Sequence, residues 1–255
     1  MKSLEWFLNT DDDKFILGSP DPSSSNIPSW YKSLTRFFDK DNNPTESLTM
    51  DKPHGARLTI KTCMPFLDSL TSGYLLKLWC DINVRHEEAG PVIEWASVVD
   101  PLVVRDAGTV LDTPVLDGFL PMTTVWFCPW GFKTPPGYSL LITHPFNRWD
   151  LPFITSSGIM DSDSFYAPGN IPFSLNRNFT GVIKQGTPIA QIIPIKRESW
   201  QAVNNQSIQT EGNLKATKLR NFLYGGYKAV MWHKKQDKEA IIVSPNRGQA
   251  SYARN

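Results

Sequence analysis

Short apolar segments, interrupted every few residues by proline, glycine or aspartate, fill the chain from Arg57 to Trp200. Turn residues such as Pro135-Pro136-Gly137 and Gln185-Gly186-Thr187 separate these segments, as they separate strands in hairpins. Many short strands at short spacing predict an antiparallel β-barrel or sandwich rather than alternating helices and strands. The expected strands are 56–63, 73–84, 91–99, 115–119, 123–129, 138–144, 179–183 and 188–195.

The composition agrees with a loop-rich β protein, because 255 residues include 20 Pro, 16 Gly, 14 Phe and 9 Trp. Charge is balanced, with 26 Lys and Arg against 25 Asp and Glu, so no global field attracts nucleic acid or anionic membrane. Runs of the roughly 18 apolar residues that a membrane span needs are absent from the sequence. We therefore expect a soluble protein that is either intracellular or part of an assembly built inside a cell, without membrane or nucleic-acid partners. Cys63, Cys80 and Cys128 lack C-x-x-C spacing and are expected to be buried small hydrophobes.

Residues 1–56 read as an extended N-terminal arm rather than as a packed domain. The run Ser19-Pro20-Asp21-Pro22-Ser23-Ser24-Ser25 favours extended and turn conformations. Aromatic residues on either side of this run are the expected anchors against a partner. They are Trp6, Phe7, Trp30 and Tyr31. We expect this arm to become ordered only when it lies on another surface.

Residues 201–255 read as a linker, a basic helix and a tail, after a central domain over 57–200. Apolar residues recur at steps of three and four over 213–238, which predicts a helix, and Gly225-Gly226 is expected to break or kink it. Most charged residues of this helix are basic. They indicate either a solvated face or a face that docks on a polyanion.

Two phrases carry a resemblance to a known superfamily. They are Gly158-Ile159-Met160-Asp161-Ser162-Asp163 and Gly186-Thr187-Pro188-Ile189-Ala190-Gln191. They resemble the third and fourth motifs of the dUTPase and dCTP-deaminase superfamily. The resemblance implies a mainly β fold, a dUTPase-like antiparallel β-barrel or distorted jelly roll, and a homo-oligomer in which a trimer is one possible form.

The same resemblance assigns candidate ligand-binding residues. Asp161 stands where the family places a carboxylate near the ribose or a water, with Asp163 close behind, and Gln191 stands near the phosphate end. Arg148 follows the stretch that aligns with the phosphate-binding second motif. The alternative for Asp161 and Asp163 is a turn stabilised by side-chain-to-backbone hydrogen bonds. For Arg148 the alternative is a structural salt bridge with Asp150.

Other parts of the family pattern are missing. Leu75 occupies the position of a metal-holding aspartate, and His144-Pro145 replaces an Arg-Ser pair and removes a backbone donor. A glycine-rich C-terminal arm does not follow Trp200. We therefore expect no catalytic residues, no cofactor and no metal site. Nucleotide binding or hydrolysis by a dUTPase-like accessory protein is the alternative.

Three further phrases, beginning at Met64, Thr134 and Gly186, resemble a family of uncharacterised tailed-phage proteins, notably those of marine bacteria. This resemblance covers roughly residues 27–235. It implies a phage protein that associates with other phage structural proteins, most simply as a structural or assembly component of the virion. The expected location is the virion, or the host cytoplasm during infection.

Overall fold

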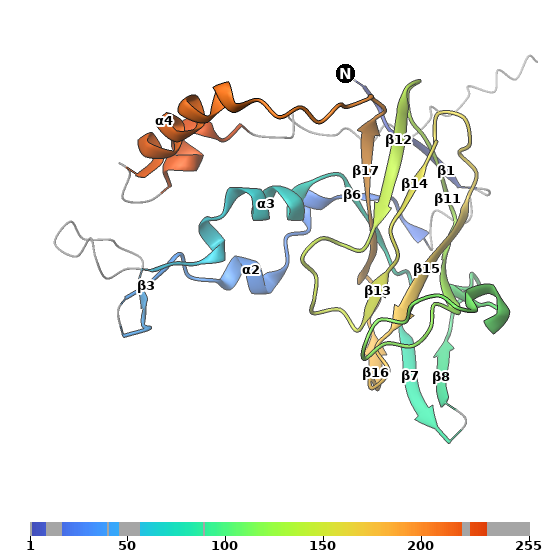
Figure 1. Ribbon diagram of the computed structural model, residues 1–255. Helices are drawn as coiled ribbons and strands as arrows, with labels where there is room; N and C mark the ends of the chain where they lie inside the picture. The colour runs from blue at the N-terminus through green and yellow to red at the C-terminus, as the bar shows by residue number, and fades with distance from the viewer. Residues whose placement is uncertain are drawn as a thin grey trace, which may run out of the picture.

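The computed structural model describes residues 2–8, 17–39, 41–45, 57–88, 90–220 and 225–233. Within these ranges the chain is mainly β, with five antiparallel sheets and a helix, α4 (Gln209–Arg220), near the C-terminus (Figure 1). The described strands belong to separate sheets and do not form one sheet closed into a barrel. This corrects the expectation of a closed barrel.

The largest sheet has five strands, in the order β14-β12-β17-β6-β2. The strand β17 (Pro188–Lys196) lies in its middle, between β12 (Tyr138–Thr143) and β6 (Tyr74–Lys77). Its edges are β14 (Gly158–Met160) and the two-residue strand β2 (Asp21–Pro22). Residues from the N-terminal fifth of the chain therefore complete the central sheet.

A second sheet, of four strands, packs against the first through a shared core (Figure 1). Its order is β13-β15-β10-β9, formed by Phe153–Thr155, Gly169–Leu175, Thr124–Cys128 and Leu102–Val104. Trp126 is fully buried and stacks on Phe173, with ring centroids 3.7 Å apart, and its indole meets Phe153 edge-on at 4.9 Å. Aromatic side chains from one sheet thus fill much of the space between the two sheets, which stabilises their packing.

Two smaller sheets lie at opposite ends of this core. The hairpin of β7 (Ile82–Glu87) and β8 (Gly90–Trp95) pairs with β16 (Gly181–Ile183) at the lower end of Figure 1. The N-terminal strand β1 (Glu5–Leu8) pairs along its whole length with β11 (Trp130–Lys133).

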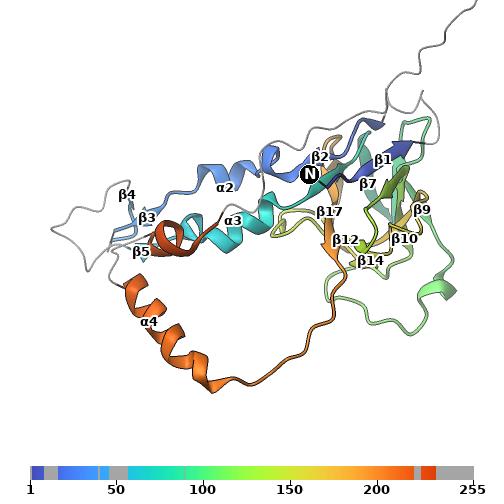
Figure 2. The same cartoon turned by 90° about the horizontal axis from the view of Figure 1, so that it is seen from above.

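A helical lobe projects from the edge of the sheets (Figure 2). It contains α2 (Ser29–Ser33), α3 (Met64–Thr71), the short 3-10 turns η1 (Ser23–Ser25) and η2 (Ile60–Thr62), and a small sheet. That sheet has the order β4-β3-β5, from Pro44–Thr45, Phe37–Phe38 and Arg57–Leu58. The lobe therefore joins the described part of 17–45 to residues 57–72, which the sequence assigned to the central domain.

Pairing of β1 and β2 within the sheets corrects the expectation of an arm that depends on a partner for order. Leu17 is buried in the main core, and the backbone amide of Ser23 donates to the carbonyl of Gly73 at 2.9 Å. Side chains from the N-terminal segment thus contribute to the same hydrophobic core as the central strands.

Several expected strands have different limits. The segment 56–63 holds only β5 before η2, because the Thr59 side chain accepts from the Lys61 amide and turns the chain. The segment 73–84 is two strands, β6 and β7, and 115–119 is a turn that touches the sheet through one bridge, Phe119 to Asn176. The helix α3 and the strands β11, β13, β14 and β15 were not expected from periodicity.

Downstream of β17 the chain leaves the sheets, forms the 3-10 turn η4 (Gln206–Ile208) and continues into α4. The expected interruption at Gly225 is confirmed, since its φ is +67°. A π-helical turn, η5 (Tyr227–Met231), follows, whereas the remainder of the expected helix, at 221–224 and 234–238, lies outside the described residues. Between β9 and β10 there is one further 3-10 turn, η3 (Ala107–Val110). No helix in the described ranges is long and apolar enough to cross a membrane.

Candidate functional site

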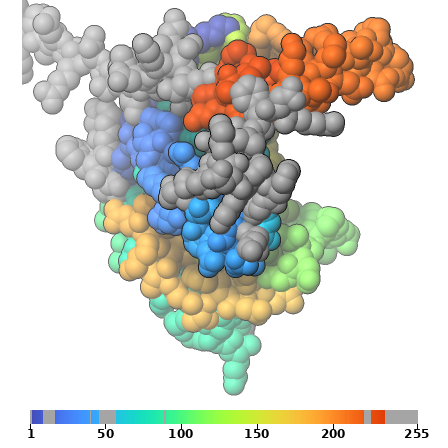
Figure 3. Space-filling model, turned by 90° about the vertical axis from the view of Figure 1, so that its left-hand side faces the viewer, coloured from blue at the N-terminus to red at the C-terminus, as the bar shows by residue number. Residues whose placement is uncertain are grey.

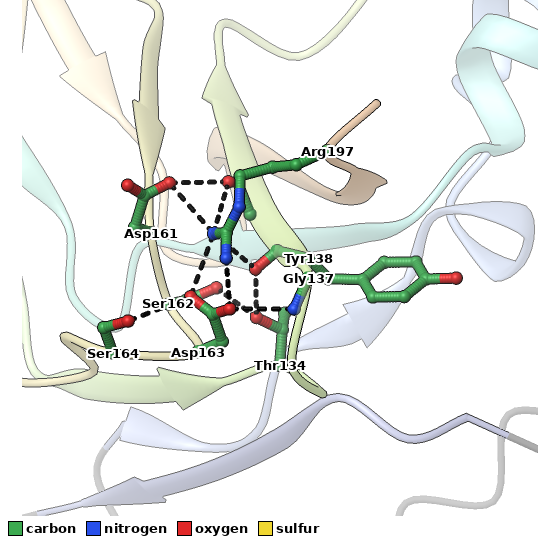
Figure 4. A network of polar contacts seen from close by, with 9 residues as sticks. Thr134, Gly137, Tyr138, Asp161, Ser162, Asp163, Ser164 and Arg197 are labelled. Carbon is green, nitrogen blue, oxygen red and sulfur yellow. Dashed lines mark hydrogen bonds and ion pairs between the residues drawn. The ribbon is translucent and has the colours of Figure 1, made fainter. Parts of the chain in front are cut away.

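Asp163 lies at the centre of a polar network beside β12 and β14 (Figure 4). Arg197 donates to both carboxylate oxygens of Asp163, through Nη1 to Oδ1 at 2.9 Å and through Nη2 to Oδ2. The amide of Gly137 also donates to Oδ2, at 2.9 Å. Hydrogen bonds from Arg197 first, and then from Gly137, hold the pKa of Asp163 far below its ordinary value. This carboxylate is therefore a fixed anion rather than a general base.

Asp161 joins the same network at its edge. Its Oδ1 accepts from Ser139 at 2.7 Å and from Arg197 at 3.1 Å. The Asp161 side chain is 66% exposed, whereas that of Asp163 is 8% exposed, so the two carboxylates differ sharply in their access to solvent. Antiparallel pairing of β12 with β14 and β17 brings Ser139, Asp161 and Arg197 to one end of the sheet.

The backbone near the two aspartates is tied down as well. Thr134 and Ser162 share a hydroxyl hydrogen bond of 2.7 Å, and the Thr134 amide donates to the carbonyl of Ser162. The alternative reading, in which aspartate side chains bond to backbone, is confirmed for Asp163, although its amide partner, Gly137, belongs to a different turn. Among the described residues, no group of three His, Cys, Asp or Glu side chains is arranged to hold a metal ion.

Gln191 is almost fully buried and bonds only to its own chain. Its Oε1 accepts from the Phe146 amide at 2.8 Å, and its Nε2 donates to the carbonyls of Ser69 and Ser72 at 3.0 and 2.6 Å. The side chain thus joins β17, the end of α3 and the loop after β12. With one acceptor and two donors committed, it has little capacity left for a ligand.

Arg148 forms the salt bridge with Asp150 that was the structural alternative, with two hydrogen bonds of 2.8 Å. Close by, His144 is half-buried, and this partial burial lowers its pKa. Its Nδ1 faces the Thr155 amide at 3.3 Å and its Nε2 faces the Arg148 carbonyl at 3.1 Å, so the neutral ring with its proton on Nε2 fits both partners. The loop that replaces the family's second motif is thus held by its own hydrogen bonds.

A pocket of ≈ 340 Å³ lies at the start of β17, at the opposite end of this strand from the Asp163 network. Leu75, at the position that the resemblance assigns to a metal-holding aspartate, meets there with Arg148 and with the Gly186 turn of the fourth motif-like phrase. The lining residues are Asn26, Leu75, Lys77, Arg148, Leu151, Gln185, Gly186, Thr187 and Pro188. Gly186 has a φ of +83°, which allows the tight turn that the sequence predicted at this position. Asp161, Asp163 and Gln191 do not line the pocket.

The four aromatic residues expected to bind a partner contact their own chain. The Phe7 ring covers Gly131, where a β-carbon would meet it at 2.2 Å, and Trp6 packs partly buried against the main core. Tyr31 is buried and stacks on Phe66 with ring centroids 5.8 Å apart, and Trp30 meets both rings edge-on. These side chains hold the N-terminal segment to the body of the protein.

Sequence reasoning missed Arg197, Ser139 and Lys77. Arg197 stands in a charged run, Lys196-Arg197-Glu198, that is typical of a strand end, and its role depends on the pairing of β17 with β12. The local signal was therefore a cation directly after an apolar strand, without any sign of its partner. The expected burial of the cysteines is confirmed for Cys80 and Cys128, whereas Cys63 is only half-buried. Burial raises the pKa of Cys128 to about 12.

Comparisons with known proteins give limited matches. No family model matches the chain, and no curated protein matches it. Among solved structures, a mutant dUTPase of Staphylococcus bacteriophage 80alpha matches at 13% identity and a TM-score of 0.26, over 49% of this chain and 88% of that one. A mutant dUTPase from phage phi11 of S. aureus matches at 14% identity and the same TM-score, over 49% and 96%. We draw neither fold nor function from matches of this size.

Proposed function

We propose that this protein is non-catalytic and acts by association, as a structural or assembly component of a tailed-phage particle. The observation that carries the proposal is the exposure of α4. Every side chain from Gln209 to Lys218 is exposed, and among the described elements α4 packs mainly on η4 rather than on a sheet (Figure 3). A lone helix of this length is marginal in water, so a partner surface would stabilise it.

The chain that leads to α4 strengthens the case. Between Arg197 and Ile208 every residue is exposed, including Trp200 at 86% and Val203 at 71%. Large apolar side chains lose contact with water when a partner covers them, at about 25 cal/mol per Å² of apolar surface. Trp200, Val203 and Leu214 are therefore the residues of this segment that we assign to partner contact.

The contacts of Asp161 and Asp163 give little support to the alternative function, nucleotide hydrolysis. Hydrolysis of a nucleotide needs a carboxylate free to hold a metal or to orient water. Here Arg197 spans both aspartates, and the position of the expected metal ligand holds Leu75, which is buried. These contacts support the absence of catalysis. We further propose that the two facing sheets are a distorted jelly roll of the dUTPase type, on the motif spacing in the sequence.

The phage assignment rests on the family resemblance over residues 27–235, and the virion is its direct test. Mass spectrometry of purified particles should detect the protein. If the protein is abundant in infected lysate but absent from particles, the structural assignment is contradicted and an accessory role in the host cytoplasm is favoured.

Nucleotide binding is the second candidate, and one observation favours it. Leu75 and the Gly186 turn line the ≈ 340 Å³ pocket, together with Lys77 and Arg148. Both cations already have acidic partners, Asp21 and Asp150, so an anionic ligand would have to compete with them.

Calorimetry and turnover assays with dUTP and dCTP plus magnesium separate these functions. We expect neither binding nor turnover. Turnover that Asp161→Asn abolishes would establish an enzyme. Tight binding without turnover would establish a binding module, provided that Arg148→Met weakens it and Arg177→Met, a change at an exposed arginine that does not line the pocket, leaves it unchanged.

A further inference from the structure

A histidine that follows the large sheet closes one edge of the four-stranded sheet. In the described part of the chain, the edge strand β13 pairs with β15 alone. The Ser156 amide, next to this strand, donates to the Pro172 carbonyl of β15 at 2.8 Å. Because bonding alternates along an antiparallel strand, the Thr155 amide points to the opposite, open side. There it donates to Nδ1 of His144, the residue that directly follows β12, at 3.3 Å.

Thr155 is the residue through which the two sheets join at this edge. It is 2% exposed. Its hydroxyl donates to the Ile189 carbonyl of β17 at 2.6 Å and accepts from the Trp126 indole at 3.1 Å. Its amide and its hydroxyl thus connect β13 to two places in the large sheet. Since a buried amide that loses its acceptor costs free energy, the contact with His144 contributes to this joint.

One protonation state of His144 satisfies both of its hydrogen bonds. Nδ1 has to accept from the Thr155 amide, whereas Nε2 faces the Arg148 carbonyl, which can only accept, at 3.1 Å. The neutral ring with its proton on Nε2 meets both requirements. A protonated ring carries a second N–H on Nδ1, so it sets two donors against each other and leaves the buried Thr155 amide without an acceptor.

The surroundings of the ring give the protonated form little compensation. The charged groups that face it are Arg148 and Asp150, in its own loop, and they are paired with each other by two hydrogen bonds of 2.8 Å. From β13 the ring faces Thr155 and Phe153, the latter edge-on with ring centroids 6.0 Å apart, and neither residue titrates. The Asp150 carboxylate is thus already neutralised by a guanidinium.

We propose that His144 is an acid-sensitive switch: its neutral ring holds the β13 edge to the large sheet, and its protonation opens the connection between β12 and β13. This inference is independent of the proposed function, since it concerns how the two sheets are held together. The first half of the connection stays fixed, because the Phe146 amide bonds to Gln191 and the Asn147 side chain bonds to Ser69.

The part that acid releases is therefore 148–152, next to β13. It carries Arg148 and Leu151, which line the ≈ 340 Å³ pocket, and the indole of Trp149, which is 73% exposed. A change of pH would thus alter the pocket wall and an exposed aromatic surface together.

The range of pH follows from the direction of the shift. The pKa of His144 is lower in the folded chain than in the unfolded one, mainly because the ring is partly buried. Its stabilising effect is therefore fully present above the unfolded value of about 6.5 and is lost as the pH falls from there toward the folded value. Asp163, whose pKa lies far below its ordinary value, titrates at a much lower pH.

Two variants separate this switch from general effects of acid. His144→Asn keeps an acceptor near the position of Nδ1 and does not titrate. His86→Asn is the matched control, because His86 Nε2 faces the Phe179 carbonyl at 3.1 Å, and a protonated ring serves this acceptor as well as a neutral one.

Hydrogen exchange of the Thr155 amide, followed by NMR on the full chain at pH 7.5 and pH 5.0, gives the readout as a protection factor, which removes the chemical dependence of exchange on pH. We expect protection to fall at least about threefold at pH 5.0 in the wild type and in His86→Asn, since each unit by which the pKa is lowered allows up to a tenfold change. Protection in His144→Asn should be the same at both pH values. Constant protection in the wild type, or an equal fall in His144→Asn, would refute the switch. The pKa of His144 measured by NMR in the wild type needs no variant, and a value at or above about 6.5 would refute it too.

Discussion

Arg197 and Asp163 face each other across the end of the large sheet and share two parallel hydrogen bonds, one to each carboxylate oxygen. Pairs of this geometry are among the stronger polar contacts in proteins, because opposite charges are joined by two parallel N–H···O hydrogen bonds. The sequence motif that suggested a nucleotide site thus contributes to structure here, and Arg197 is the reason.

This ion pair makes the free energy of unfolding depend on pH in the acidic range. The pKa of Asp163 is lower in the folded chain than in the unfolded one, so its stabilising effect is fully present above the unfolded value of about 3.9. It disappears as the pH falls from there toward the folded value. Urea unfolding of the wild type and of Asp163→Asn from pH 7 to pH 2.5 should give a constant stability gap above about pH 5 that narrows below pH 4. A gap that stays constant throughout would contradict the assignment.

Comparing Gly73 with Gly186 separates the cost of a left-handed backbone from the cost of a steric clash, because both have a positive φ and only Gly73 has close neighbours. A β-carbon at Gly73 would meet the Ile192 carbonyl oxygen at 2.1 Å, whereas one at Gly186 would meet nothing within 4 Å. Gly186→Ala should therefore cost only about 1–2 kcal/mol of left-handed strain. Gly73→Ala should cost more than about 3 kcal/mol, because β6 must also move away from β17. Denaturant unfolding of both variants checks this order. An equal loss of unfolding free energy in the two variants would mean that the Ile192 carbonyl moves away from residue 73 at little cost.

The periodicity of apolar residues identified the central strands well. It failed where contacts between residues distant in sequence determine the local structure. The segments 123–129, 138–144 and 188–195 were placed within one or two residues, because their apolar side chains face a core on a strand. The segment 56–63 has similar alternation, yet the Thr59 side chain caps a turn there. The arm was misjudged because the partner strands of β1 and β2, β11 and β6, lie far along the chain.

The two aspartates of the candidate site were predictable from the sequence, but their roles and their partners Arg197 and Ser139 were not. Asp161 and Asp163 do come together, and Arg148 does meet Asp150. What sequence could not supply was the cation that neutralises the aspartates, since Arg197 lies 34 residues beyond Asp163. Gln191 likewise resembles a ligand in the motif, but its amide nitrogen donates to the carbonyls of Ser69 and Ser72, at the end of α3, which only the folded chain brings near.

Gln191 offers a test of that structural role. Gln191→Met keeps the length of the side chain and leaves the Phe146 amide and two carbonyls without their partner. Buried unsatisfied groups should lower the free energy of unfolding by about 2–4 kcal/mol. The matched control, Gln185→Met on the exposed turn, should change it by less than about 0.5 kcal/mol. Equal stability of the two variants would mean that solvent reaches the Gln191 site.

The return of the chain to the body after α4 depends on Trp232. Its indole Nε1 donates to the Asp68 carboxylate, at 3.1 and 3.0 Å from the two oxygens, and so joins η5 to α3. Trp232→Phe keeps the ring but removes this charge-assisted donor, which is worth about 1.5–3 kcal/mol. We expect amide exchange over Tyr227–Met231 to accelerate at least about tenfold in this variant, since the local opening becomes easier. Trp200→Phe, at an indole that is 86% exposed, should leave that exchange unchanged. Unchanged protection in Trp232→Phe would show that apolar packing alone fixes η5 on the lobe.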